Sequence, residues 1–193
     1  MARLTGLLSA GFLSAAVSLQ LLLAGAVGLV SETAIAGPAS AAATPVEPDG
    51  IAKMLTGKFV GDGVFVDHSS GAKRGIKLDI LGTLEGDKLT LVEDTAFSDG
   101  EKQHKVWVFT KASAGEWIGR RSDVIGEARV SQNGSNVKMS YKAHVLKDGK
   151  TWDLKFNEAY EIKSPDLIIS KTEVSYLFLT VGVADLTIRR AGK

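Results

Sequence analysis

Apolar and polar side chains alternate with a period of two over most of the chain after residue 57. The alternation is clearest in residues 76–80, 136–146 and 151–163. Because successive side chains of a strand point to opposite faces, each of these runs has one apolar and one polar face. The pattern predicts half-buried strands. It argues against a parallel sheet, whose strands are covered on both faces.

Turn signals separate these runs. Asn133-Gly134 and Asp148-Gly149 supply the positive φ that tight hairpins need. About nine or ten strands are expected, joined by short links in an antiparallel up-and-down order. The expected strands are 58–66, 74–83, 88–97, 102–111, 115–121, 124–131, 136–146, 151–162, 166–176 and 183–190. Such a meander hides its edges by closing into an all-β barrel, which can enclose one small ligand as lipocalins do.

The stretch 174–183 departs from the alternation. Its sequence, Val-Ser-Tyr-Leu-Phe-Leu-Thr-Val-Gly-Val, is apolar at several consecutive positions. A short continuous apolar run is typical of a strand that is buried on both faces. The same run also fits an apolar lip near the mouth of a barrel. Both interpretations stay open at this point.

The first 41 residues have the composition of an export signal. Arg3 is the basic start, residues 4–30 are almost entirely apolar or small, and three Ala-x-Ala patterns follow. Cleavage is expected after Ala41, with Ala36 as the second choice. The apolar run is also long enough to span a bilayer, so an uncleaved membrane anchor is the alternative. The expected location is the periplasm or the cell envelope.

Three segments are therefore expected: a signal helix in 1–41, a tether with a short helical turn in 42–56, and the barrel in 57–193. The chain has no cysteine, so neither a disulfide nor a lipidated cysteine is possible. Its formal net charge is +1. A nucleic-acid partner is not expected, because phosphate binding needs a clustered basic face. Membrane association is expected only if the N-terminal segment stays uncleaved.

Two carboxylates fall on apolar strand faces. Glu158 shares the parity of Phe156 and Tyr160, and Glu93 shares the parity of Leu91. A buried carboxylate is costly unless it is paired or hydrogen-bonded, and burial raises its pKa. The interpretation is a polar patch that orients a ligand inside an apolar cavity. Alternatively, both acids lie at strand ends that reach water, or the strands bulge. The predicted ligand-binding residues are Glu93, Tyr141, Trp152, Glu158 and Tyr160.

Other chemistry has little support in the sequence. The three histidines are scattered, and only His104, near Trp107, is a candidate for the interior. No Gly-x-Ser-x-Gly elbow occurs. Asp123 and Glu127 are interpreted as solvated acids of a turn, or else as a cation-binding rim. No metal and no cofactor are expected.

Several spaced motifs carry a family resemblance. They are Gly61-x-Gly63-x-Phe65-x-Asp67, Glu93-Asp94, Ser98-Asp99-Gly100-Glu101 with Trp107, Ser122-Asp123-Val124-Ile125-Gly126-Glu127-Ala128, Gly134-x-Asn136 with Tyr141, and Trp152-x-x-x-Phe156. Together they resemble the domain of unknown function 3833 family of bacterial envelope proteins, many of which are lipoproteins. The resemblance implies an envelope location and a calycin-like barrel, but no activity. The chain departs from the family by lacking the lipoprotein cysteine and by retaining only part of an acidic pair in 157–160.

Three functions are considered from these observations. The first is binding of a small apolar or lipid-like ligand inside the barrel. The second is a filled barrel that acts as an interaction module in the envelope, with protein partners that the sequence does not identify. The third, ranked last, is an enzyme that uses the interior acids for proton transfer.

Overall fold

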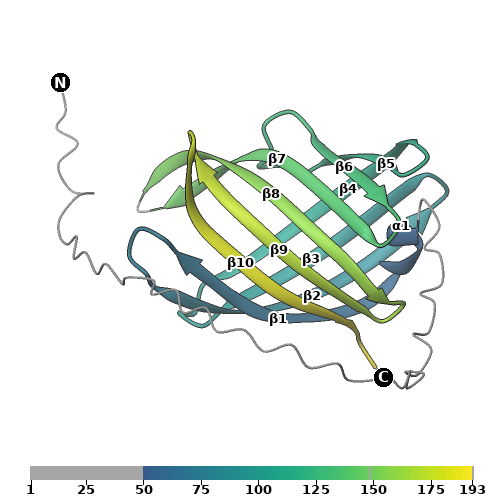
Figure 1. Cartoon of the computed structure of the whole chain (residues 1–193), viewed down its shortest axis with the longest axis horizontal. Coiled ribbons are helices and arrows are strands. Elements are labelled where there is room, and N and C mark those ends of the chain that lie inside the picture. Colours follow the sequence, from purple (N-terminus) through teal and green to yellow (C-terminus); the bar gives the residue numbers. More distant parts are fainter. Residues whose placement is uncertain (1–49, 148, 193) are drawn as a thin grey trace, which may run out of the picture. The chain divides into compact units, whose positions relative to one another are not determined.

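The computed structural model describes residues 50–147 and 149–192, which form one short helix and ten strands (Figure 1). The expected signal segment lies outside the described residues. The helix is α1 (Gly50–Met54). The strands are β1 (Gly57–Asp67), β2 (Lys73–Glu85), β3 (Lys88–Phe97), β4 (Lys102–Ser113), β5 (Glu116–Arg120), β6 (Ala128–Asn133), β7 (Asn136–Lys147), β8 (Lys150–Ser164), β9 (Leu167–Tyr176) and β10 (Leu179–Arg190).

The strands form a closed antiparallel barrel. Each strand pairs with its neighbours in sequence, and β1 pairs with β10 to complete the ring. The closing ladder runs from Phe59 opposite Arg190 to Asp67 opposite Gly182. Closure gives every strand a neighbour on both sides, with the short β5 pairing β4 only from Val108 onward. The prediction of an all-β, up-and-down barrel is confirmed.

Side-chain parity decides what lies inside the ring. In β7, Val137, Met139 and Tyr141 are buried, whereas the intervening Lys138 and Ser140 are exposed. The other long strands alternate in the same way and contribute to one buried cluster, which includes Trp107, Phe109 and Trp117. The hydrophobic core is therefore the wall of a central lumen.

Two segments differ from the expected strands. β6 begins at Ala128 rather than at residue 124, because residues 121–127 form a loop that runs along β7. The Ile125 amide donates to the Lys142 carbonyl at 2.8 Å, and the His144 amide donates to the Asp123 carbonyl at 2.8 Å. The loop thus continues the barrel wall beyond the short β5 and β6. The apolar stretch 174–183 forms a hairpin turn at Leu177-Phe178, which confirms the lip interpretation.

Helix α1 plugs one end of the barrel (Figure 1). Ile51 and Ala52 are buried in the core cluster. The guanidinium of Arg190 donates to the carbonyls of Met54, at 2.9 Å, and of Thr56, at 3.0 Å. Carbonyls at a helix C-terminus lack partners within the helix, so this contact satisfies them. The short helical turn expected at the end of the segment 42–56 is present as α1, and Ile51 and Ala52 make it part of the core. Among the residues described, no helix has the length and apolarity that a membrane span requires.

A substitution at Gly82 tests whether α1 packs against the barrel wall. A Cβ at this position would lie 1.7 Å from the Leu55 carbonyl oxygen, whereas a Cβ at Gly75, on the same strand, would meet only Ser98 at 3.4 Å. We expect Gly82→Ala to displace α1 and to lower the free energy of unfolding by about 1–3 kcal/mol. The control, Gly75→Ala, should change it by less than about 1 kcal/mol. Urea unfolding measures both values, and equal stability of the two variants would contradict the plug.

Candidate functional site

The lumen holds a cavity of about 350 Å³. Toward α1 its wall is apolar, with Leu91, Trp117 and Ile168 among the lining residues. Toward the opposite end Val145, Leu154 and Val174 line it, together with the polar Arg74 and Gln103. Further polar side chains form a band at mid-depth. The cavity is therefore largely apolar with a polar region at mid-depth.

The polar band contains acids, bases and phenols from five parts of the wall. Glu93 on β3 lies directly opposite Lys105 on β4. Arg121 enters from the loop after β5, and β7 and β8 supply the rest. We call this set the charge cluster. Its members are Glu93, Lys105, Arg121, Tyr141, Glu158 and Tyr160.

Glu158 is held by two phenols. The Tyr141 hydroxyl donates to its Oε1 at 2.7 Å, and the Tyr160 hydroxyl donates to its Oε2. Burial, and then the negative charge of Glu158, raise the pKa of both tyrosines well above the usual value. Both phenols therefore stay protonated and remain donors. The two hydrogen bonds fix the position of the Glu158 carboxyl group in the wall of the cavity.

Glu93 is the titratable acid of the cluster. Burial, and secondly repulsion from Glu158, raise the pKa of Glu93 from 4.5 to about 7. Its carboxyl group therefore changes charge near neutral pH. Such a shift in a cavity is typical of functional sites, although structural charge clusters also produce it.

The two cations differ in how they are satisfied. Arg121 Nε lies 2.5 Å from Asp123 Oδ1, and the guanidinium stacks 4.2 Å from the centroid of Trp107. The Arg121 side chain is only 4% exposed. Burial, and then the nearby Arg121 charge, lower the pKa of Lys105. Among the residues that the structure describes, the Lys105 ammonium has no hydrogen bond and no ion pair.

The structure brings together four of the five residues predicted as a ligand site. Glu93, Tyr141, Glu158 and Tyr160 all line the cavity, at mid-strand positions rather than at strand ends. Trp152 does not line it. That side chain lies at the start of β8, beyond the cavity, and packs edge-on against Tyr176 with ring centroids 5.2 Å apart. Ligand binding by these residues stays a prediction.

Sequence reasoning missed Lys105 and Arg121. Lys105 shares the parity of Trp107, and Arg121 continues the inward parity of Trp117 and Gly119, so counting alternate positions would have found both. The same count places His104 outside, where its Nδ1 lies 2.7 Å from Asp94 Oδ1.

The two acids of the loop after β5 are both paired. Asp123 binds Arg121, and Glu127 binds Arg120. Within 50–147 and 149–192, no group of three or more His, Asp or Glu side chains is placed to hold a metal ion.

Comparisons with known proteins support the fold. The family described as "Protein of unknown function (DUF3833)" matches residues 40–190. No curated protein matches the chain. The S-type phycobiliprotein lyase CPES from Guillardia theta is similar in structure, with 11% identity over 76% of this chain and 94% of the other and a TM-score of 0.57. Rv2717c from M. tuberculosis has 11% identity over 75% and 98%, with a TM-score of 0.54. The barrel is thus of the lipocalin-like, calycin type.

The raised pKa of Glu93 predicts a pH-dependent stability. The folded state holds the proton of Glu93 more tightly than the unfolded chain does. Its contribution to the free energy of unfolding is therefore fully present below pH 4.5 and is lost as the pH rises to about 7. We expect Glu93→Gln to remove this loss, making the variant more stable than the wild type at pH 8 by roughly 3 kcal/mol. Near pH 4.5 the two proteins should be similarly stable.

Urea unfolding between pH 4.5 and 8 measures the effect. Glu173→Gln, at an exposed position of β9, is the matched control and should follow the wild-type profile. A difference between Glu93→Gln and the wild type that does not grow with pH would contradict the assignment.

Proposed function

We propose that the barrel of this chain, which belongs to the DUF3833 family of proteins of unknown function, binds a small, largely apolar molecule of lipid or fatty-acid type. One observation carries the proposal: an apolar cavity with a cluster of buried charges at mid-depth. A purely structural core would gain nothing from these charges, because burying them is costly.

The size and lining of the cavity suit such a ligand. A volume of about 350 Å³ lies within the range of small-molecule sites. Burial of the ligand's apolar surface would supply most of the affinity, at about 25 cal/mol per Å². The alternative of a filled barrel acting as an interaction module is disfavoured by this volume.

The charge cluster would orient the ligand. Lys105 faces the cavity, and its ammonium lies in the field of Asp123, Glu93 and Glu158 but has no hydrogen bond or ion pair among the described residues, so it can pair with a carboxylate or another anionic group of a ligand. Tyr141 and Tyr160 are committed to Glu158 and hold that acid in place. The ligand's polar group would therefore lie beside Lys105, and its apolar parts would extend toward the ends of the lumen.

A second candidate function is proton transfer on a bound molecule. The observation that favours it is the pKa of Glu93, about 7, because a general acid or base works best near the operating pH. This function also begins with ligand binding, so the binding experiments below apply to both.

We also propose an envelope location. The basic start, the apolar run and the Ala-x-Ala patterns of residues 1–41 support export. A protein that binds apolar molecules would be useful in the envelope, because such molecules must cross the aqueous space outside the cytoplasmic membrane. Separating periplasmic, membrane and culture fractions of cells that express the full chain tests the location.

Filling the cavity should weaken binding. Ala184 on β10 is buried and lines the lumen, whereas Ala159 on β8 is exposed on the outer wall. We expect Ala184→Phe to weaken binding of the fluorescent fatty acid cis-parinaric acid by roughly tenfold or more, since each lost 1.4 kcal/mol is tenfold. Ala159→Phe should bind as the wild type does. No binding by the wild type, together with no lipid in mass spectra of the purified protein, would contradict the proposal.

Lys105 should select for an anionic group. We expect Lys105→Met to weaken binding of a fatty acid by roughly tenfold or more, because a hydrogen bond to a charged group is lost. Binding of the fatty alcohol of the same chain length should change little. Displacement of parinaric acid measures both ligands. The control is Lys138→Met, at an exposed position of β7. An equal loss for acid and alcohol would show that Lys105 does not hold the head group.

A further inference from the structure

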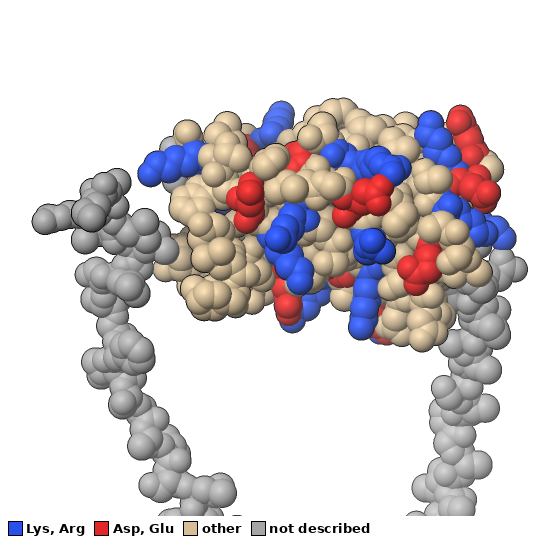
Figure 2. Space-filling view, turned by 90° about the horizontal axis from the view of Figure 1, so that it is seen from above, with Lys and Arg blue, Asp and Glu red and all other residues tan. Residues whose placement is uncertain are grey.

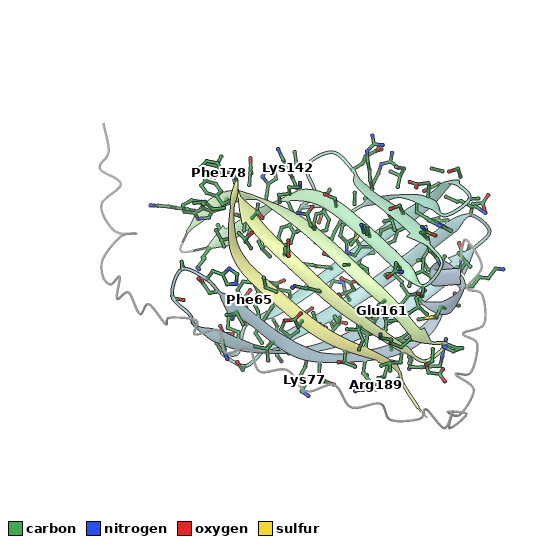
Figure 3. All side chains as sticks on the ribbon, in the orientation of Figure 1. Phe65, Lys77, Lys142, Glu161, Phe178 and Arg189 are labelled. Atoms are coloured by element: carbon green, nitrogen blue, oxygen red, sulfur yellow. The ribbon has the colours of Figure 1, made fainter. Side chains whose placement is uncertain are left out.

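The end of the barrel opposite α1 carries exposed apolar side chains at two hairpin tips. Figure 3 shows Phe178 projecting from the turn between β9 and β10. Phe178 is 87% exposed, Leu177 76% and Leu146, on the β7–β8 hairpin, 74%. We call this surface the hairpin lip. Its residues are Leu146, Trp152, Tyr176, Leu177, Phe178 and Leu179.

The two tips form one surface. Trp152 of the first hairpin and Tyr176 of the second pack edge-to-face, with ring centroids 5.2 Å apart. Leu177 has a φ of 54°, a conformation that bulky residues rarely adopt. Its exposed side chain gains little packing in return. Large apolar residues held at an exposed, strained turn indicate a contact outside the barrel.

The lip is continuous with the wall of the lumen. Val145 precedes Leu146 in β7, Leu154 follows Trp152 by two positions in β8, and both line the cavity. An apolar molecule could therefore pass between the lumen and whatever covers the lip without crossing water. This last step depends on the proposed function, whereas the docking surface does not.

We propose that the hairpin lip docks the open end of the barrel onto the surface of a phospholipid bilayer. Trp and Tyr side chains with Leu and Phe are the residues that anchor proteins at a bilayer interface. They project from narrow turn tips, which can enter a lipid layer.

The charges near the lip also suit a lipid surface. The turn between β7 and β8 carries Lys147 and Lys150 against one acid, Asp148, in the sequence. Asp67 pairs with one of these lysines, its Oδ2 lying 3.4 Å from Lys147 Nζ. Lys150 is exposed. In Figure 2 the visible face mixes charges of both signs, and uncharged residues occupy much of its left end. The fold thus offers a membrane contact other than residues 1–41.

Trp152 is a built-in probe for this docking. Trp107 and Trp117 are 2% and 4% exposed, whereas Trp152 is 37% exposed at the lip. The test uses residues 42–193, which hold α1 and all ten strands of the closed barrel, so residues 1–41 cannot contribute. The protein is mixed with vesicles of brominated phosphatidylcholine, with and without phosphatidylglycerol. We expect quenching of tryptophan emission that Trp152→Phe abolishes.

Paired substitutions separate the lip from the rest of the surface. Phe178→Ser with Leu179→Ser should lower vesicle partitioning roughly tenfold or more, because less apolar surface enters the lipid. The matched control is Leu81→Ser with Val106→Ser, which removes exposed apolar groups from the outer wall and should leave partitioning unchanged. Near-UV circular dichroism checks that both variants keep the barrel fold.

Three outcomes would overturn the docking surface. They are no quenching of the wild type, equal quenching of the lip variant, or a wild-type dimer in light scattering that the lip substitutions dissociate without any vesicle binding. Parinaric acid binding without vesicles is measured in parallel. The lip variant should retain it, so failure of the docking surface and failure of the proposed function give different results.

Discussion

Closure of the sheet is the constraint on which the rest of the structure depends. When ten antiparallel strands form one ring, every second side chain of every strand points into the same lumen. Whatever residue type stands at an inward position must then be accommodated there. The apolar wall around Trp107 and the charges of Glu93 and Lys105 have the same geometric origin.

The lumen accommodates its charges in different ways. Glu158 accepts hydrogen bonds from two phenols, and Arg121 pairs with Asp123 while stacking on Trp107. Glu93 is satisfied in part by holding its proton up to about pH 7. Lys105 remains available to the cavity. Glu158 and Arg121 therefore have fixed partners and build the site, whereas Glu93 and Lys105 can respond to a ligand.

The two ends of the barrel have opposite characters. At one end α1 inserts Ile51 and Ala52 into the core, and Arg190 binds the carbonyls that follow. At the other end the tip of the β9–β10 hairpin exposes Leu177 and Phe178. The two ends therefore present different surfaces: α1 covers one end, and exposed apolar hairpin tips stand at the other.

The sequence by itself determined the barrel, because a period of two, set by strand geometry, is local and can be read without knowing which strands meet. It also put Glu93 and Glu158 on the apolar faces of their strands, through parity, while the structure shows that both lie at mid-strand in the lumen wall. Three features were decided only by the tertiary structure: the plug formed by α1, the placement of the loop 121–127 along β7, and the displacement of Trp152 to the rim. Each depends on where distant segments meet after closure. Local alternation carries no information on those contacts.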